Sequence, residues 1–99
     1  MRISSQTQDV IRETVLELFG PDCIVMLFGS RVNDAARGGD IDLLVQSKTP
    51  IKDRQRKALQ LVARLQIRLG DQPIDVLVLD SQTEQQPIHQ EAIRTGVRL

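Results

Sequence analysis

Two aspartates, Asp40 and Asp42, begin the apolar segment "DIDLLVQ", and a third, Asp75, lies inside the apolar segment "PIDVLVLD". Side chains at positions i and i+2 of a strand point to the same face, so Asp40 and Asp42 should project together, with Cα atoms about 7 Å apart. If the strand of Asp75 lies beside theirs, the three carboxylates form one patch. Carboxylate oxygens are hard ligands that suit Mg²⁺ or Mn²⁺, so the pattern predicts a site for two such ions.

The charge of this patch indicates what else it would bind. Two like charges 4 Å apart repel each other by about 4 kcal/mol at an effective dielectric constant near 20. Three bare carboxylates would therefore be strained, or one of them would take up a proton. A divalent cation removes that repulsion, and its remaining coordination positions and positive field suit a polyphosphate.

The pair Gly29-Ser30 follows an apolar run and could bind the phosphates, opposite the metal ions held by the aspartates. Glycine lets the backbone approach a phosphate closely, and the amides and the serine hydroxyl of a strand-to-helix turn can donate to an anion. Arg31 is either a further phosphate contact or a solvated loop arginine. Asp75 would then orient or deprotonate an incoming hydroxyl, as a general base or through the second metal ion.

Each of these features alone has a simpler explanation. A Gly-Ser pair is most often only a turn, and two aspartates one residue apart are common by chance. Aspartate is depleted inside strands, so Asp75 is harder to explain as an ordinary surface residue. Asp71 or Asp80, at the ends of the strand, could nevertheless be the surface version of the same residue if the strand register differs. The order of the pieces along the chain, rather than any one of them, favours a phosphate-transfer site.

The elements that must position these residues follow from hydrophobic periodicity. The sequence predicts helices at 6–19, 51–69 and 85–95, the last with Ser81 and Thr83 as plausible caps, and strands at 23–28, 40–46 and 73–80. A short loop favours antiparallel pairing of the first two strands, and a connecting helix favours a parallel crossover between the second and third. The expected fold is α+β with two layers, a small mixed sheet with helices packed largely on one face, in a single domain spanning residues 1–99.

Composition narrows the class of protein further. The chain has 13 basic and 13 acidic residues, so its formal net charge is zero, and only two aromatic residues. These values argue against direct nucleic-acid binding, which needs a basic surface and stacking platforms. The N-terminus has no apolar signal core and no apolar segment approaches membrane-spanning length, so we expect a cytoplasmic protein that does not bind membranes. His89, the only histidine, is expected at the surface or at a partner contact.

The stretch "FGSRVNDAARGGDIDLLV" resembles the signature of the DNA polymerase β-like nucleotidyltransferase superfamily. The short chain is similar to its minimal nucleotidyltransferases, the MNT or MntA-type antitoxins that are paired with HEPN ribonuclease toxins. The resemblance implies the nucleotidyltransferase fold and Mg²⁺-dependent transfer of AMP from ATP to a tyrosine of the toxin, which silences it, in a type VII toxin–antitoxin pair. It also implies a complex with the HEPN toxin.

The resemblance assigns roles to the same residues. Gly29 and Ser30 match the phosphate-binding pair, Asp40 and Asp42 the metal-binding pair, and Asp75 the third carboxylate. The loop between Ser30 and Asp40 is slightly shorter than is usual in the family, a difference that a loop absorbs easily. Two alternatives remain open: an antitoxin that neutralises its partner by binding alone, and a small-molecule transferase similar to the aminoglycoside nucleotidylyltransferases.

Overall fold

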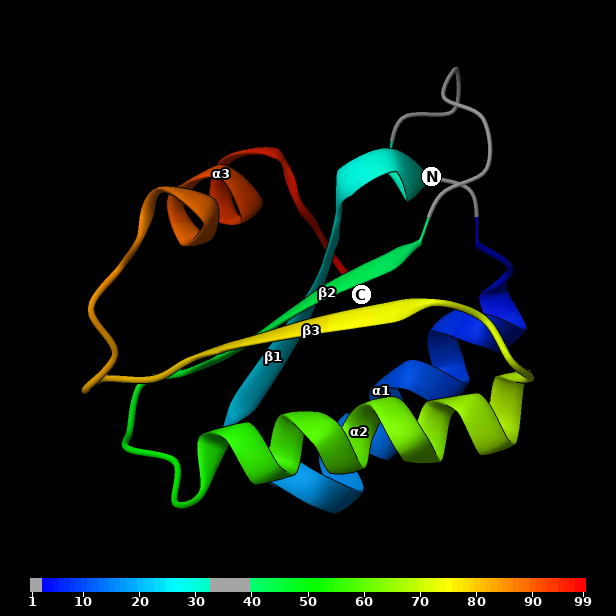
Figure 1. Cartoon of the computed structure of the whole chain (residues 1–99), viewed down its shortest axis with the longest axis horizontal. Coiled ribbons are helices and arrows are strands. Elements are labelled where there is room, and N and C mark those ends of the chain that lie inside the picture. Colours follow the sequence, from blue (N-terminus) through cyan, green and yellow to red (C-terminus); the bar gives the residue numbers. More distant parts are fainter. Residues whose placement is uncertain (1–2, 33–39) are drawn as a thin grey trace.

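The computed structural model of the chain describes residues 3–32 and 40–99, and within them three helices, a 3-10 turn and four strands (Figure 1). In chain order they are α1 (Ser5–Phe19), β1 (Cys23–Phe28), η1 (Gly29–Arg31), β2 (Ile41–Ser47), α2 (Arg54–Leu69), β3 (Ile74–Leu79), α3 (Pro87–Thr95) and β4 (Val97–Arg98). The predicted order of helices and strands is confirmed. The two-residue strand β4 was not predicted.

The four strands form one mixed sheet in the order β3-β2-β1-β4. β1 pairs antiparallel with both β2 and β4, while β2 and β3 run parallel and are joined through α2. Both predicted strand pairings are therefore confirmed. The parallel pair brings the first residues of β2 and β3 to the same edge of the sheet, where β1 ends.

The helices divide between the two faces of the sheet, with α1 and α2 on one face and α3 on the other (Figure 1). β2 shows the division: Ile41, Leu43 and Val45 are buried in the main core with residues of α1 and α2, whereas Leu44 belongs to a smaller cluster with Ala92 of α3. Alternate residues of a strand face opposite sides, so this assigns every residue of β2 to a face. Two of the three helices cover one face, as predicted.

Two predicted helix starts are corrected by the structure. The second helix begins at Arg54 instead of residue 51, because Asp53 has a left-handed backbone (φ 55°) and the Ile51 amide donates to Asp80 Oδ2 at 2.6 Å. The last helix begins at Pro87 instead of residue 85, and its cap is Gln86 rather than Ser81 or Thr83.

None of the helices in the described part of the chain combines the length and the apolar character that a bilayer crossing requires.

Candidate active site

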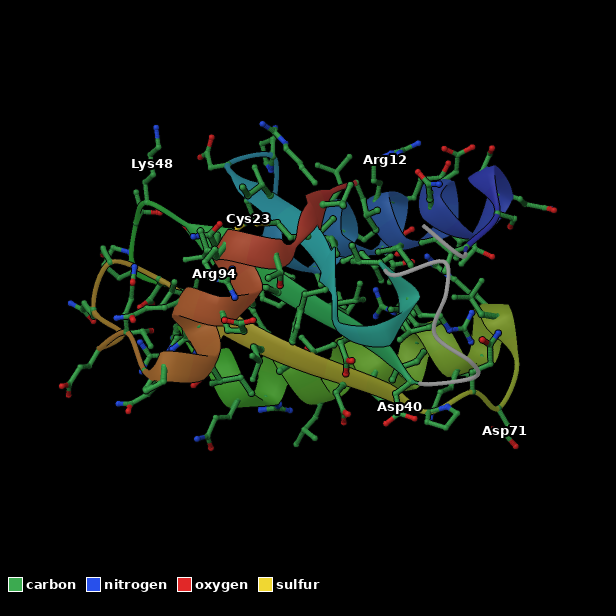
Figure 2. The ribbon with its side chains drawn as sticks, turned by 90° about the horizontal axis from the view of Figure 1, so that it is seen from above. Arg12, Cys23, Asp40, Lys48, Asp71 and Arg94 are labelled. Carbon is green, nitrogen blue, oxygen red and sulfur yellow. The ribbon has the colours of Figure 1, made fainter. Side chains whose placement is uncertain are left out.

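The carboxylates of Asp42 and Asp75 lie side by side on the face of the sheet that carries α3. The two residues occupy equivalent positions in β2 and β3 and are register partners in the parallel ladder. Residues an even number of positions apart in a strand face the same side of the sheet. Asp42 therefore faces the same side as Leu44, and Asp75 the same side as Leu79, and both leucines pack in the cluster beneath α3. Asp40 directly precedes β2 and is exposed (Figure 2). The topology thus brings the predicted carboxylates to one edge of one face.

Negative charge is crowded around Asp42. Partial burial raises the pKa of its carboxyl above the ordinary value, and the negative charges of Asp75 and Asp40 raise it further. A hydrogen bond between the Asp42 and Asp75 side chains acts in the same direction. Such a bond needs a proton on one of the two carboxyls, which is the direction in which the raised pKa of Asp42 acts.

Gly29 forms the wall against which the Asp42 carboxylate rests. It follows β1 directly, opens the turn η1 and has a positive φ of 76°, a conformation that residues with a Cβ rarely adopt. A Cβ at this position would overlap Asp42 Oδ2 and would lie 3.1 Å from Asp42 Cγ. The site therefore needs glycine here both for the backbone conformation and for the space.

Ser30 and Arg31 complete the turn η1, which is closed by a hydrogen bond from the Val32 amide to the Gly29 carbonyl at 3.2 Å. Arg31 is half-buried. The turn places both residues immediately after Gly29, so their amides lie at the same sheet edge as the carboxylates. Their predicted contact with phosphate stays a prediction. The rest of the predicted loop, residues 33–39, lies outside the described residues.

The carboxylates are close together without forming a finished coordination sphere. Across residues 3–32 and 40–99, no group of three or more acidic, histidine or cysteine side chains is arranged to hold a metal ion by itself. Asp42 and Asp75 are in contact, whereas Asp40 acts on Asp42 through its charge alone. The donor chemistry nevertheless fits a hard cation, since the carboxylates of Asp40, Asp42 and Asp75 offer oxygen ligands and repel one another.

Asp80, considered as an alternative to Asp75, belongs to a different part of the molecule. It is buried at the end of β3, where Arg54 Nη1 donates to its Oδ1 at 2.7 Å and the Ile51 amide donates to its Oδ2. Further bonds come from Thr83 Oγ1 and the Gln82 amide. These hydrogen bonds, led by the one from Ile51, lower the pKa of Asp80 well below its ordinary value. Asp80 therefore anchors the start of α2 to the end of β3.

The prediction for His89 was wrong in one respect, because its side chain is buried. Its Nδ1 accepts a hydrogen bond from the Gln86 amide at 2.9 Å, and the Gln86 side chain in turn caps the backbone of His89. This reciprocal pair is a capping box in which histidine stands where glutamate or glutamine is usual. The signal was present in "QPIH", with Pro87 at the first helical position.

The model of the family "Polymerase beta, Nucleotidyltransferase" matches residues 22–99, a range that contains Gly29 and all three aspartates. Among curated proteins, none matches the chain.

Solved structures show the same fold. The chain is similar to one described as the tri-AMPylated Shewanella oneidensis HEPN toxin in complex with MNT antitoxin (TM-score 0.66, 18% identity, covering 97% of this chain and 71% of that chain). It is also similar to a toxin–antitoxin structure with AMP-PNP (TM-score 0.67, 19% identity, 92% and 70%) and to a mutant MntA-HpeT toxin–antitoxin (TM-score 0.66, 18% identity, 92% and 70%). With the family model covering most of its length, the chain belongs to the polymerase β nucleotidyltransferase family.

Proposed function

We propose that the chain transfers AMP from ATP to a tyrosine hydroxyl of a HEPN-type toxin and thereby acts as the antitoxin of that toxin. The observation that carries the proposal is the pairing of Asp42 with Asp75, backed by Gly29, in a member of the nucleotidyltransferase family. Acidic clusters of this kind at a sheet edge are suited to phosphoryl-type transfer, in which positioning and charge stabilisation do most of the catalytic work.

In this proposal Asp40, Asp42 and Asp75 would hold two Mg²⁺ ions. When bound, the ions would neutralise the charge of the triphosphate and of the departing pyrophosphate. The amides of Gly29 and Ser30, with the Arg31 side chain, would bind the phosphates on the side of the leaving group.

Asp75 would orient the acceptor hydroxyl and accept its proton. A bond forms between the acceptor oxygen and the α-phosphorus, and the bond from that phosphorus to the bridging oxygen breaks, releasing pyrophosphate.

Two comparisons support the identity of the substrates. One similar solved structure contains AMP-PNP, an ATP analogue, and another contains an AMPylated HEPN toxin with an MNT antitoxin. By analogy with that complex, a partner protein would supply the acceptor in a hetero-oligomer.

The test is to incubate the chain and its cognate toxin with ATP and Mg²⁺ and to measure the mass of the toxin. We expect the toxin to gain the mass of AMP on tyrosine and to lose ribonuclease activity. Asp42→Asn should abolish both effects, whereas Asp71→Asn, which removes an exposed aspartate before β3, should abolish neither. An unmodified toxin, under conditions in which ATP binds to the chain, would refute the proposal.

A second candidate function is neutralisation of the toxin by binding alone. It is supported by one similar solved structure, described as a HEPN toxin in complex with MNT antitoxin. Under this alternative Asp40→Asn and Asp42→Asn would neutralise the toxin at unchanged affinity. The same assay decides between the two, because only transfer leaves AMP on the toxin.

A further inference from the structure

The strand β3 forms an open edge of the sheet. In the described part of the chain it pairs with β2 on one side and has no strand on the other. The Pro73 carbonyl accepts from the Ile41 amide at 3.0 Å, so it points toward β2. Backbone groups of alternate residues in a strand point to the same side, so those of Ile74, Val76 and Val78 point outward. An open edge of this length is a template for a further strand.

The flank of α2 that borders this edge is uncharged along the middle of the helix. Gln55 and Ala58 line a groove together with Val78 of β3. Gln66 Nε2 donates to the Gln72 carbonyl, which precedes β3, at 3.2 Å. Helical spacing adds the residues one turn along. This uncharged flank consists of Gln55, Ala58, Leu59, Val62 and Gln66.

The basic side chains further along α2 point the other way. Arg64 and Arg68 both donate to Glu17 of α1, on the side of the helix away from β3. Leu59 remains on the uncharged flank with 71% of its surface exposed. Val76 and Val78 of the open edge are half-buried on the same face of the sheet. Edge and flank therefore form one continuous strip of apolar and uncharged groups.

This strip lies on the broadest side of the molecule. Figure 1 views the chain down its shortest axis with β3 and α2 in front, and the other two extents are 35 and 29 Å. In Figure 2, turned by 90°, β3 and α2 again lie together, along the side away from α1. A stable interface covers about 800 Å² on each partner, an area that fits within this side.

We propose that this side binds a second copy of the chain, with the two β3 strands paired antiparallel about Val76. Directly opposed residues in an antiparallel ladder exchange both of their hydrogen bonds or neither. Centring the pair on Val76 sets it opposite its own counterpart and sets Ile74 opposite Val78, so every outward residue is paired. Their side chains meet on the face covered by α2, where the two uncharged flanks pack against each other. The pairing joins two four-stranded sheets into one.

Charge favours a second copy in this register. Asp75 falls opposite Leu77 of the second copy, so the two Asp75 carboxylates do not face each other directly. Asp71, exposed ahead of β3, falls opposite Ser81 of the second copy. At that end of the edge α2 begins, with basic residues and no acidic residue in its first turn. Opposite charges therefore approach each other at both ends of a symmetric interface.

The first experiment measures the mass of the isolated chain by sedimentation velocity over a range of concentrations. We expect twice the chain mass of 11.1 kDa at about 100 μM and dissociation on dilution. Leu59→Glu should weaken dimerisation at least about tenfold, because the interface would bury an unpaired charge. A mass of 11.1 kDa at every concentration would overturn the proposal.

Ile67→Glu is the matched control. Ile67 is also on α2 and is 84% exposed, but helical spacing turns it about 80° from Leu59, away from β3. This variant should dimerise like the unmodified chain. If the chain alone is monomeric and Leu59→Glu weakens binding of the toxin, this side belongs to the toxin and the inference is wrong.

The second experiment tests the register with oxidised glutathione as the oxidant. Val76→Cys sets two thiols at a directly opposed pair, whose Cα atoms lie about 5.5 Å apart, within reach of a disulfide. Val78→Cys sets them about 14 Å apart and should not cross-link. Cys23 is present in both variants and cancels in the comparison. Equal cross-linking of the two variants would overturn the register.

The pairing does not depend on the proposed function, because it uses neither a nucleotide nor a metal ion. A dimer that leaves the toxin unmodified would refute AMP transfer and leave the dimer standing. A monomer that modifies the toxin would do the reverse.

Discussion

Replacing Gly29 with alanine tests whether the space behind Asp42 matters for chemistry apart from stability. Two penalties arise in the structure. The first is the backbone conformation, because a non-glycine residue with φ near 76° costs about 1–2 kcal/mol. The second is steric, because the new Cβ would overlap Asp42 Oδ2 and lie 3.1 Å from Cγ.

The steric penalty should appear mainly as lost activity. The Asp42 carboxylate can escape the overlap only by moving away from Gly29, by about 1 Å, and toward Asp75. Misplacing a catalytic group by about 1 Å can lower the rate of transfer about 100-fold. We therefore expect Gly29→Ala to remain folded, with a lower free energy of unfolding, and to lose about 99% of its AMP transfer.

Gly70 provides a matched control, because it also has a positive φ, of 94°, but a Cβ added there would meet nothing within 4 Å. Gly70→Ala should show a similar loss of stability in thermal unfolding and nearly full transfer activity. The comparison cancels the backbone penalty and isolates the overlap with Asp42. Equal activities of the two variants, in a transfer assay with the toxin at fixed concentration, would refute the reasoning.

Three further predictions concern charge and capping. Asp75→Asn should abolish transfer. It should also raise the free energy of unfolding at pH 7 by up to about 1 kcal/mol, because it removes a negative charge that raises the pKa of Asp42 in the folded state. Calorimetry of the two proteins, with and without the substitution, measures this difference in stability. The lowered pKa of Asp80 means that its stabilisation is complete above the ordinary carboxyl range, begins to be lost as the pH falls through that range, and is fully lost only below the lowered pKa. Asp80→Asn should therefore be less stable at pH 7 and should respond less to acid between about pH 5 and pH 3 in denaturant titrations. His89→Ala should lower the free energy of unfolding by about 1 kcal/mol through loss of the cap, whereas His89→Gln, which keeps an acceptor, should lose less; urea unfolding at one pH distinguishes them.

The pairing of Asp42 with Asp75 could be predicted from the sequence because two simple rules converge on it. A helix between two strands places them parallel, and the parity of a strand assigns each residue to a face. Both aspartates are the second residue of their strands, so the parallel register brings them together. The contact of Gly29 with Asp42 could not be predicted in the same way, since it depends on the antiparallel register that sets Phe28 opposite Asp42.

The burial of His89 and the strand β4 were missed for a common reason, which is that both depend on tertiary contacts. A single histidine carries no periodic signal, and its burial follows from the position of α3 on the sheet. Val97–Arg98 is too short for any alternation, and it becomes a strand only because Met26 and Leu27 of β1 lie beside it. Similarly, the late start of α2 follows from Asp80, which is 29 residues away from Ile51 in the chain.

The structure also explains how so small a domain tolerates a crowded acidic site. Ile41 and Leu43, the neighbours of Asp42 in β2, are 1% and 0% exposed on the face covered by α1 and α2. Full burial of each such side chain contributes about 1.5–3 kcal/mol, which exceeds the penalty of one partly buried, repelled carboxyl. Because alternate residues point to opposite faces, the apolar contacts of Ile41 and Leu43 lie on the opposite side of β2 from Asp42. The core can therefore hold Asp42 against Asp75 in spite of their repulsion, and a bound cation would relieve that repulsion.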